Sequence, residues 1–238
     1  MSVRRDQRGF SLIELAIVLV IIGLLVGGGI AALNAVAQQT RRTEAERQLE
    51  HVREALYGFA MSEGRLPCPD TNDPPDGSED LSGNDCDDNW GALPWSELQL
   101  GRRDPWGSLL LYRVDPDFAD TNTSPAFALS DSGNLTVEDG EGNNIVTTSP
   151  AVIVAFGPQG AQIWTDSGFT CPSAGTNDFS ADESENCDDD NTFVAAEFRP
   201  PDAGTDPTNP GEGRFDDVLI WVPLPVLKAR MVDAGLLP

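Results

Sequence analysis

The beginning of the chain divides into an apolar stretch and a polar one. Residues 15–39 carry no charged side chain, and the 19 residues from Leu15 to Leu33 are almost wholly apolar. A helix of this length crosses about 30 Å of hydrocarbon. The pattern therefore predicts a transmembrane segment over residues 10–39.

Residues 40–64 show the periodicity of an amphipathic helix. Their larger apolar side chains recur at spacings of three, four and three residues: Leu49, Val52, Leu56 and Phe59. This spacing places them on one helix face. We expect one helix from about Phe10 to Ser62, with residues 40–64 as its amphipathic spine, ending at Gly64 ahead of Pro67.

Residues 65–238 alternate short apolar runs with turn residues, which is typical of β-strands. The expected strands are 109–114, 126–129, 135–138, 145–148, 151–156, 162–164, 193–198 and 218–222. Short strands joined by turns pair in antiparallel fashion, and the apolar face of the spine needs a sheet to cover it. The predicted fold is α+β, with the long N-terminal helix packed on an antiparallel β-sheet head and a short helix beginning at Pro225.

The net charge of −24 lies entirely in the expected head. Residues 1–64 sum to zero, so residues 65–238 carry all of it. An acidic surface repels phosphate backbones, which disfavours DNA binding by the head, and we expect no nucleic acid as a partner. Clusters of acids serve either as a solubilising face or as oxygen ligands for calcium.

Four cysteines, Cys68, Cys86, Cys171 and Cys187, lie in the head. The chain has one His and no C-x-x-C motif, so a zinc site is disfavoured. Disulfides are expected if the head is exported. Of the three possible pairings we favour Cys68 with Cys86 and Cys171 with Cys187. Each of these pairs closes a polar, acidic loop, which stabilises the fold by roughly 3 kcal/mol.

Charged residues at the start of the apolar stretch carry the most specific signal. Arg4, Arg5 and Arg8 precede it and favour a cytoplasmic N-terminus. Glu14 lies inside it, where a carboxylate costs a few kcal/mol unless it is paired. A cut between Gly9 and Phe10 of a neighbouring copy would expose an amine to pair with Glu14.

The run Gly9-Phe10-Ser11-Leu12-Ile13-Glu14, with the apolar stretch behind it, resembles the N-terminal signal of type IV prepilins and type II secretion pseudopilins. The resemblance implies a leader over residues 1–9, cleavage after Gly9 by a prepilin peptidase, and N-methylation of Phe10. It further implies a pilin-like fold and assembly through the hydrophobic helix with other pilin subunits and an inner-membrane platform. Glu14 would neutralise the amine of the adjacent subunit.

The N-terminus leaves two alternatives open. A conventional secretory signal peptide would use Ala35-Val36-Ala37 as a cleavage site before Gln38, but its apolar core would be shorter and would lack a carboxylate. A plain single-span anchor would leave the cost of Glu14 unexplained.

Candidate chemistry in the head is limited to metal binding. The sequence contains no catalytic motif, so we expect no enzymatic activity. The segment from Gly211 to Asp217 resembles, loosely, the loop in which major pseudopilins bind calcium, and Asp216 and Asp217 would supply oxygen ligands. The alternatives are that these two acids cap a turn or that the run 188–190 binds the ion.

The sequence therefore predicts a membrane protein with residues 1–9 as leader, 10–39 as transmembrane and filament-core helix, 40–64 as spine and 65–238 as periplasmic head. We expect a structural subunit, more consistent with a minor than a major one, of a type II secretion pseudopilus or a type IV pilus. The alternative function is a calcium-dependent adhesin or ligand-binding head anchored by a pilin-like helix.

Overall fold

The longest element is a single helix, α1 (Leu12–Glu63). The computed structural model describes residues 12–165, 168–173, 179–200 and 213–238. Gly64 follows α1 with a φ of 80°, and its N–H donates to the carbonyl of Ala60. Glycine adopts this left-handed conformation without steric cost, which ends the helix. The predicted continuous helix is confirmed from Leu12 to its end, and its expected start near Phe10 lies outside the described residues.

The chain groups into two compact units, Met1–Arg41 and Arg42–Pro238. In the first unit, every side chain described from Leu12 to Leu24 is exposed. Within the part of the chain that the structure describes, no helix combines the length and the apolar composition needed to cross a membrane. The transmembrane segment over residues 10–39 stays a prediction.

A four-stranded antiparallel sheet forms the centre of the second unit. Its strand order is β11 (Val218–Trp221), β7 (Ala151–Ala155), β4 (Leu111–Val114) and β3 (Trp90–Ala92). Every residue of the central strand β7 is buried, because apolar side chains cover both faces of the sheet. The α+β class with an antiparallel sheet is confirmed.

One face of this sheet packs on the second half of α1. Leu49, Val52 and Leu56 are buried in the same cluster as Tyr112 of β4 and Ile153 of β7. The terminal helix α5 (Leu224–Asp233) adds Leu227 and Met231 to this cluster. The apolar stripe of the spine is therefore covered by the sheet, as its spacing predicts.

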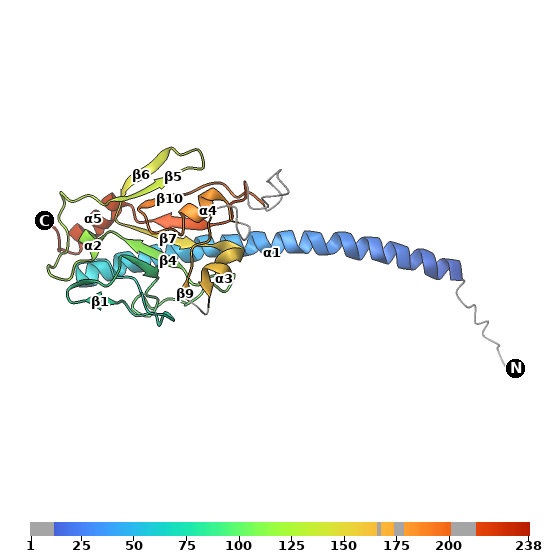
Figure 1. The fold of residues 1–238 in the computed structure, drawn as a ribbon, viewed down its shortest axis with the longest axis horizontal. Helices are drawn as coiled ribbons and strands as arrows, with labels where there is room; N and C mark the ends of the chain where they lie inside the picture. The colour runs from blue at the N-terminus through green and yellow to red at the C-terminus, as the bar shows by residue number, and fades with distance from the viewer. Residues whose placement is uncertain (1–11, 166–167, 174–178, 201–212) are drawn as a thin grey trace. The chain divides into compact units, whose positions relative to one another are not determined.

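The opposite face carries a second core beneath a smaller sheet, ordered β10 (Thr192–Val194), β5 (Leu135–Glu138) and β6 (Asn144–Ser149). Figure 1 shows these three strands on the side of β7 away from α1. β5 and β6 are antiparallel, but β10 runs parallel to β5. The expectation of antiparallel pairing is wrong for β10, because the long connection after β6 returns the chain in the same direction, as parallel pairing requires.

The remaining elements are short. They are β1 (Leu81–Ser82), β2 (Asp85–Cys86), α2 (Pro116–Ala119), η1 (Gly157–Gln159), α3 (Gly160–Ile163), β8 (Trp164–Thr165), β9 (Gly168–Phe169) and α4 (Ala181–Glu185). Two predicted strands are wrong. Residues 126–129 form no strand, because Phe127 packs as loop against Phe118. The segment 162–164 is the end of α3 and the start of β8.

Candidate functional site

The predicted processing site falls at the edge of the described chain. Gly9 and Phe10 lie outside the described residues, whereas Glu14 lies in the first turn of α1 and is exposed. An acid in the first turn interacts favourably with the positive end of the helix dipole. The apolar side chains that surround it along the helix are exposed as well, from Leu12, which is 88% exposed, to Leu24. Glu14 is thus a carboxylate set within an exposed apolar surface.

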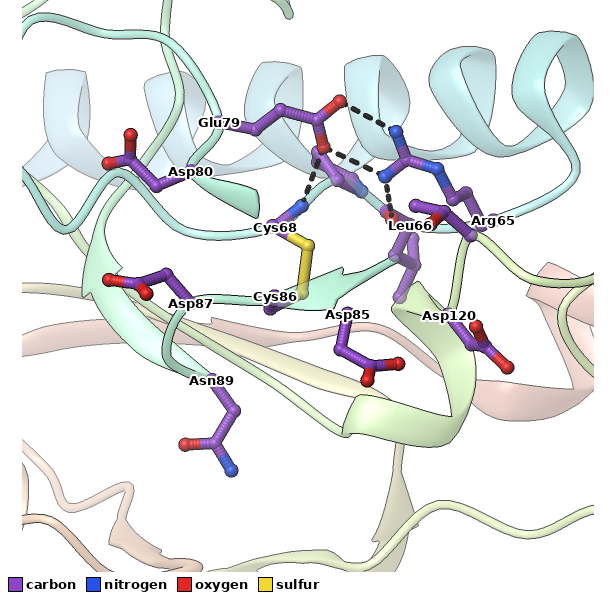
Figure 2. Close-up of a disulfide and its surroundings, with 12 residues drawn as sticks. Arg65, Leu66, Cys68, Glu79, Asp80, Asp85, Cys86, Asp87, Asn89 and Asp120 are labelled. Carbon is purple, nitrogen blue, oxygen red and sulfur yellow. Dashed lines mark hydrogen bonds and ion pairs between the residues drawn. A yellow bond between two sulfur atoms is a disulfide. The ribbon is translucent and has the colours of Figure 1, made fainter. Parts of the chain in front are cut away.

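The first disulfide joins Cys68 to Cys86, with 5.2 Å between their Cα atoms. Figure 2 shows the carboxylate of Glu79 between the Arg65 guanidinium and the backbone of Cys68. Arg65 donates to both oxygens of Glu79, at 2.6 and 2.8 Å, and the Cys68 N–H donates to Oε2 at 3.0 Å. The disulfide loop is therefore tied to Arg65, two residues beyond the end of α1.

Acids inside this first loop organise its turns. Asp70 is buried, and its carboxylate accepts hydrogen bonds from the backbone N–H groups of Gly77 and Asn72. Burial raises the pKa of Asp70, and these backbone donors oppose that rise. Asp80 accepts from the backbone and side chains of Thr71 and Asn72. Part of the acidic composition of the head thus has a structural role in turns.

The second disulfide joins Cys171 to Cys187, with 5.3 Å between Cα atoms. The structure contains both disulfides that the sequence favours. Between these cysteines α4 begins with a capping box, in which Ser180 accepts from the Glu183 N–H and Glu183 accepts from the Ser180 N–H. Two orphan donors at the helix N-terminus are satisfied in this way.

The carboxylates of Glu183, Asp216 and Asp217 come together in the core of the head. Each offers an oxygen that lies within 4.8 Å of the others, and all three residues are buried. We call them the buried acid cluster. The sequence points to Asp216 and Asp217 but misses Glu183, although the spacing from Ser180 to Glu183 is a recognisable capping-box signal.

Hydrogen bonds fix each acid of the cluster. Arg214 donates to Asp216 Oδ2 from Nε at 2.8 Å and from Nη2 at 2.5 Å. Asn186 Nδ2 donates to Asp217 Oδ2 at 2.9 Å, and the Asp216 N–H donates to Glu183 Oε1 at 3.1 Å. Among the described residues, Asp216 Oδ1 is buried with no hydrogen-bond partner. One carboxylate oxygen in the cluster is therefore left without compensation for its burial.

Burial raises the pKa of all three acids. It is the largest cause for Asp217, whose pKa lies well above its usual range, with the negative charge of Glu183 as the next cause. Burial also raises the pKa of Glu183 and of Asp216, and the Arg214 charge opposes both rises. All three acids face Arg214, and Asp216 also feels the charge of Arg42. Three acids and two arginines still leave negative charge that a proton or a cation would neutralise.

The donor set of the cluster fits a calcium ion in type. Calcium takes six to eight oxygen ligands, mostly carboxylates and carbonyls, and three carboxylates supply part of such a set. Arg214 occupies Asp216 Oδ2, and Asp216 Oδ1 lies close to Gly157 with no hydrogen-bond partner among the described residues. The prediction that Asp216 and Asp217 merely cap a turn does not account for their burial beside Glu183.

The run 188–190 contributes to a second group of acids. Glu185, Asp188 and Asp190 offer oxygens within 4.8 Å of one another, and Asp188 and Asp190 are exposed. Asp189 points elsewhere and pairs with Arg113 at 2.5 Å. Exposed acids of this kind are well solvated, so this group has weaker reason to hold an ion than the buried acid cluster.

The similarity to a known protein family lies at the N-terminus. Residues 4–30 match the family described as the prokaryotic N-terminal methylation motif. The chain carries a prepilin-type signal. Searches of the curated proteins and of the solved structures found no match.

The prepilin-type signal covers Gly9, Phe10 and Glu14. It supports the type IV pilin and pseudopilin family, whose members are structural subunits. It also implies processing by a prepilin peptidase and assembly with other pilin subunits. The match covers residues 4–30 and does not reach the acidic head. The head of this prepilin-type protein is therefore interpreted from its structure.

Proposed function

We propose that the protein is a minor structural subunit of a type II secretion pseudopilus or a type IV pilus. The observation that carries the proposal is the prepilin-type signal over residues 4–30. In this proposal the peptidase cleaves after Gly9, Phe10 is N-methylated, and residues 10–39 anchor the chain in the inner membrane with the head in the periplasm. Two disulfide-closed insertions support a minor position, because they would crowd a tightly packed shaft.

The exposed apolar surface of α1 supports assembly through this helix. A helix that is apolar on all sides requires lipid or protein around it, and the described side chains from Leu12 to Leu24 are exposed. In the membrane, lipid would cover them; in the filament, helices of other subunits would. The carboxylate of Glu14 would then pair with the amine of Phe10 on the adjacent subunit, which offsets the cost of a charge in an apolar environment.

The mature N-terminus tests the processing step. Mass spectrometry of the protein isolated from membranes is expected to find a chain that begins at N-methylated Phe10. A chain that begins at Gln38 would establish the secretory signal peptide instead. A chain that retains residues 1–9 would establish a plain anchor.

Substitution of Glu14 tests assembly separately. Glu14→Gln keeps the size of the side chain but removes its charge, so the amine of the next subunit stays unpaired at a cost of a few kcal/mol. We expect incorporation into filaments, measured by immunoblotting of sheared fractions, to fall by at least about tenfold. The matched control, Glu44→Gln, alters an exposed acid of the same helix. Equal incorporation of both variants contradicts the proposed role of Glu14.

A calcium-binding head, anchored by the pilin-like helix as an adhesin or ligand-binding module, is the second candidate. It is favoured by the grouping of three buried carboxylates, Glu183, Asp216 and Asp217, in which Asp216 Oδ1 has no hydrogen-bond partner among the described residues. A ligand that binds only the folded state raises stability, by about 2.7 kcal/mol at a concentration one hundred times its Kd.

Thermal melting in calcium and in chelator tests this candidate. Calcium is expected to raise the Tm of the natural protein, and Asp217→Asn is expected to abolish the rise because it removes a charged ligand. Asp188→Asn, in the exposed acid group, is the control and should retain the rise. A Tm indifferent to calcium and chelator removes the reason for a calcium-dependent function.

A further inference from the structure

A cavity of about 290 Å³ lies between the first disulfide loop and the hairpin that precedes the second. Asp70, Thr71, Asn72, Asp73 and Pro75 line it from the first loop. Strand β3 contributes Trp90 and Gly91, and β8 and β9 contribute Trp164 and Phe169. We call this the aromatic pocket. Its volume is at the lower end for ligand sites and suits one small head group or side chain.

The aromatic rings form an angular wall. Phe169 meets Trp90 with ring centroids 4.5 Å apart and planes at 82°, and it meets Trp164 at 4.8 Å and 70°. In such edge-to-face pairs the edge of one ring meets the face of the other, and the ring faces that stay uncovered carry negative π density in different directions. Parallel rings would favour a flat guanidinium or base. This arrangement favours a rounded group.

Carboxylates provide the charge of the aromatic pocket. Asp73 and Asp88 line it and are exposed, and the buried Asp70 lines it as well. No Lys, Arg or His is among the described residues that line it. A low-dielectric wall beside uncompensated negative charge concentrates cations.

Two side-chain donors of the first loop are already engaged, whereas Trp164 Nε1 is buried in the opposite wall with no hydrogen-bond partner among the described residues. The Thr71 hydroxyl lies within hydrogen-bond distance of Asp80 and Asp87 and has one proton to donate, and Asn72 Nδ2 donates to Asp80 at 3.0 Å. A sugar or an anion would need such donors to bind. The pocket therefore offers π faces and carboxylate acceptors, which together match an ammonium group.

We propose that the aromatic pocket binds an alkylammonium group, of a small quaternary amine or of a lysine side chain, over Trp90, Trp164 and Phe169 with Asp73 and Asp88 as counter-charges. This site is independent of filament assembly and of the buried acid cluster.

Ligand binding to the full-length protein in detergent tests the proposal by calorimetry and by tryptophan fluorescence. Choline is expected to bind at least about tenfold more tightly than its neutral isostere in which carbon replaces nitrogen, since cation–π contacts to partly desolvated rings reach this size. The second probe is Nα-acetyl-lysine, whose side-chain ammonium group stays free and charged. Tighter binding of choline identifies a small quaternary amine as the ligand type, and tighter binding of Nα-acetyl-lysine identifies a protein side chain.

Variants assign the binding to this pocket. Asp73→Asn and Asp88→Asn are each expected to weaken choline binding by about two- to fivefold, the range for exposed ion pairs. Trp164→Leu is expected to weaken it by about tenfold. The control Asp117→Asn removes an exposed charge in α2 and should leave binding unchanged.

Three outcomes overturn the proposal. Equal affinity for choline and its neutral isostere would mean that only apolar contact is recognised. An equal loss in the Asp73, Asp88 and Asp117 variants would mean that diffuse charge attracts the amine. Unchanged binding in Trp164→Leu, with circular dichroism confirming its fold, would place the ligand elsewhere.

Discussion

Burial outweighs pairing in setting the protonation of Asp216 and Asp217. Asp216 accepts two hydrogen bonds from Arg214, yet burial still raises its pKa. Asp217 has an amide donor, Asn186, and its pKa is raised well above its usual range by burial. An acid whose pKa is higher in the folded than in the unfolded state stabilises the fold below the unfolded pKa. That contribution is lost as the pH rises through the folded pKa.

The variant Asp217→Asn is expected to remove this pH dependence. It retains an oxygen that can accept from Asn186 but cannot ionise. In chelator, its free energy of unfolding should exceed that of the natural protein at pH 8 by about 1 kcal/mol or more, and the difference should shrink toward pH 5. Urea titrations at the two pH values measure this, with Asp117→Asn as the exposed control. A difference of the same size at both pH values would contradict the assignment.

Elements with a long or continuous apolar pattern are the ones that local sequence specifies. The stripe of α1 is buried as its spacing requires, down to Leu56 at 0% exposure. The continuous run of β7 is buried on both faces. Short apolar runs do not determine their secondary structure. Residues 126–129 are apolar enough for a strand, but Phe127 packs against Phe118 from a loop.

Truncation of the stripe tests the packing of α1 on the sheet. Leu56→Ala removes a fully buried side chain, and the lost contacts and cavity are expected to cost about 2–5 kcal/mol of unfolding free energy. His51→Ala, on the exposed face of the same helix, is the control and should change stability by less than about 0.5 kcal/mol. Similar losses in the two variants would mean that the sheet does not cover the stripe.

Contacts between residues far apart in the chain cannot be predicted from a single sequence. Glu183 joins Asp216 and Asp217 across more than thirty residues of chain, and its capping-box spacing reveals a helix start but not its neighbours. The aromatic pocket likewise requires Trp90 beside Phe169, which no local pattern encodes. The N-terminal signal could be found because its residues act through their order in the chain rather than through the fold.

Charge is the dominant property of the whole molecule. The net charge of −24 lies in residues 65–238, where like charges repel one another and destabilise the compact state. Only part of this charge is offset internally, for example by the ion pairs of Arg65 with Glu79 and of Arg113 with Asp189.

Salt is expected to stabilise the protein by screening this repulsion. The Debye length falls from about 30 Å at 0.01 M to about 3 Å at 1 M ionic strength. The Tm should therefore rise as NaCl is increased from low concentration to about 0.5 M, in chelator to separate the effect from calcium binding. Differential scanning calorimetry measures it. A Tm that falls with salt would mean that attractive ion pairs outweigh the repulsion.

The disulfide loop that begins just after α1, closed by Cys68 and Cys86, affects how the protein responds to a pulling force. Cys68 lies five residues after the end of the helix, and the Arg65 side chain and the Cys68 N–H both donate hydrogen bonds to Glu79. Tension drawn along the helix would meet a cross-link spanning 18 residues, a length that extends to roughly 60 Å when unconstrained. The disulfide keeps this segment from extending, so a pulled subunit stays short until the disulfide is reduced to two thiols.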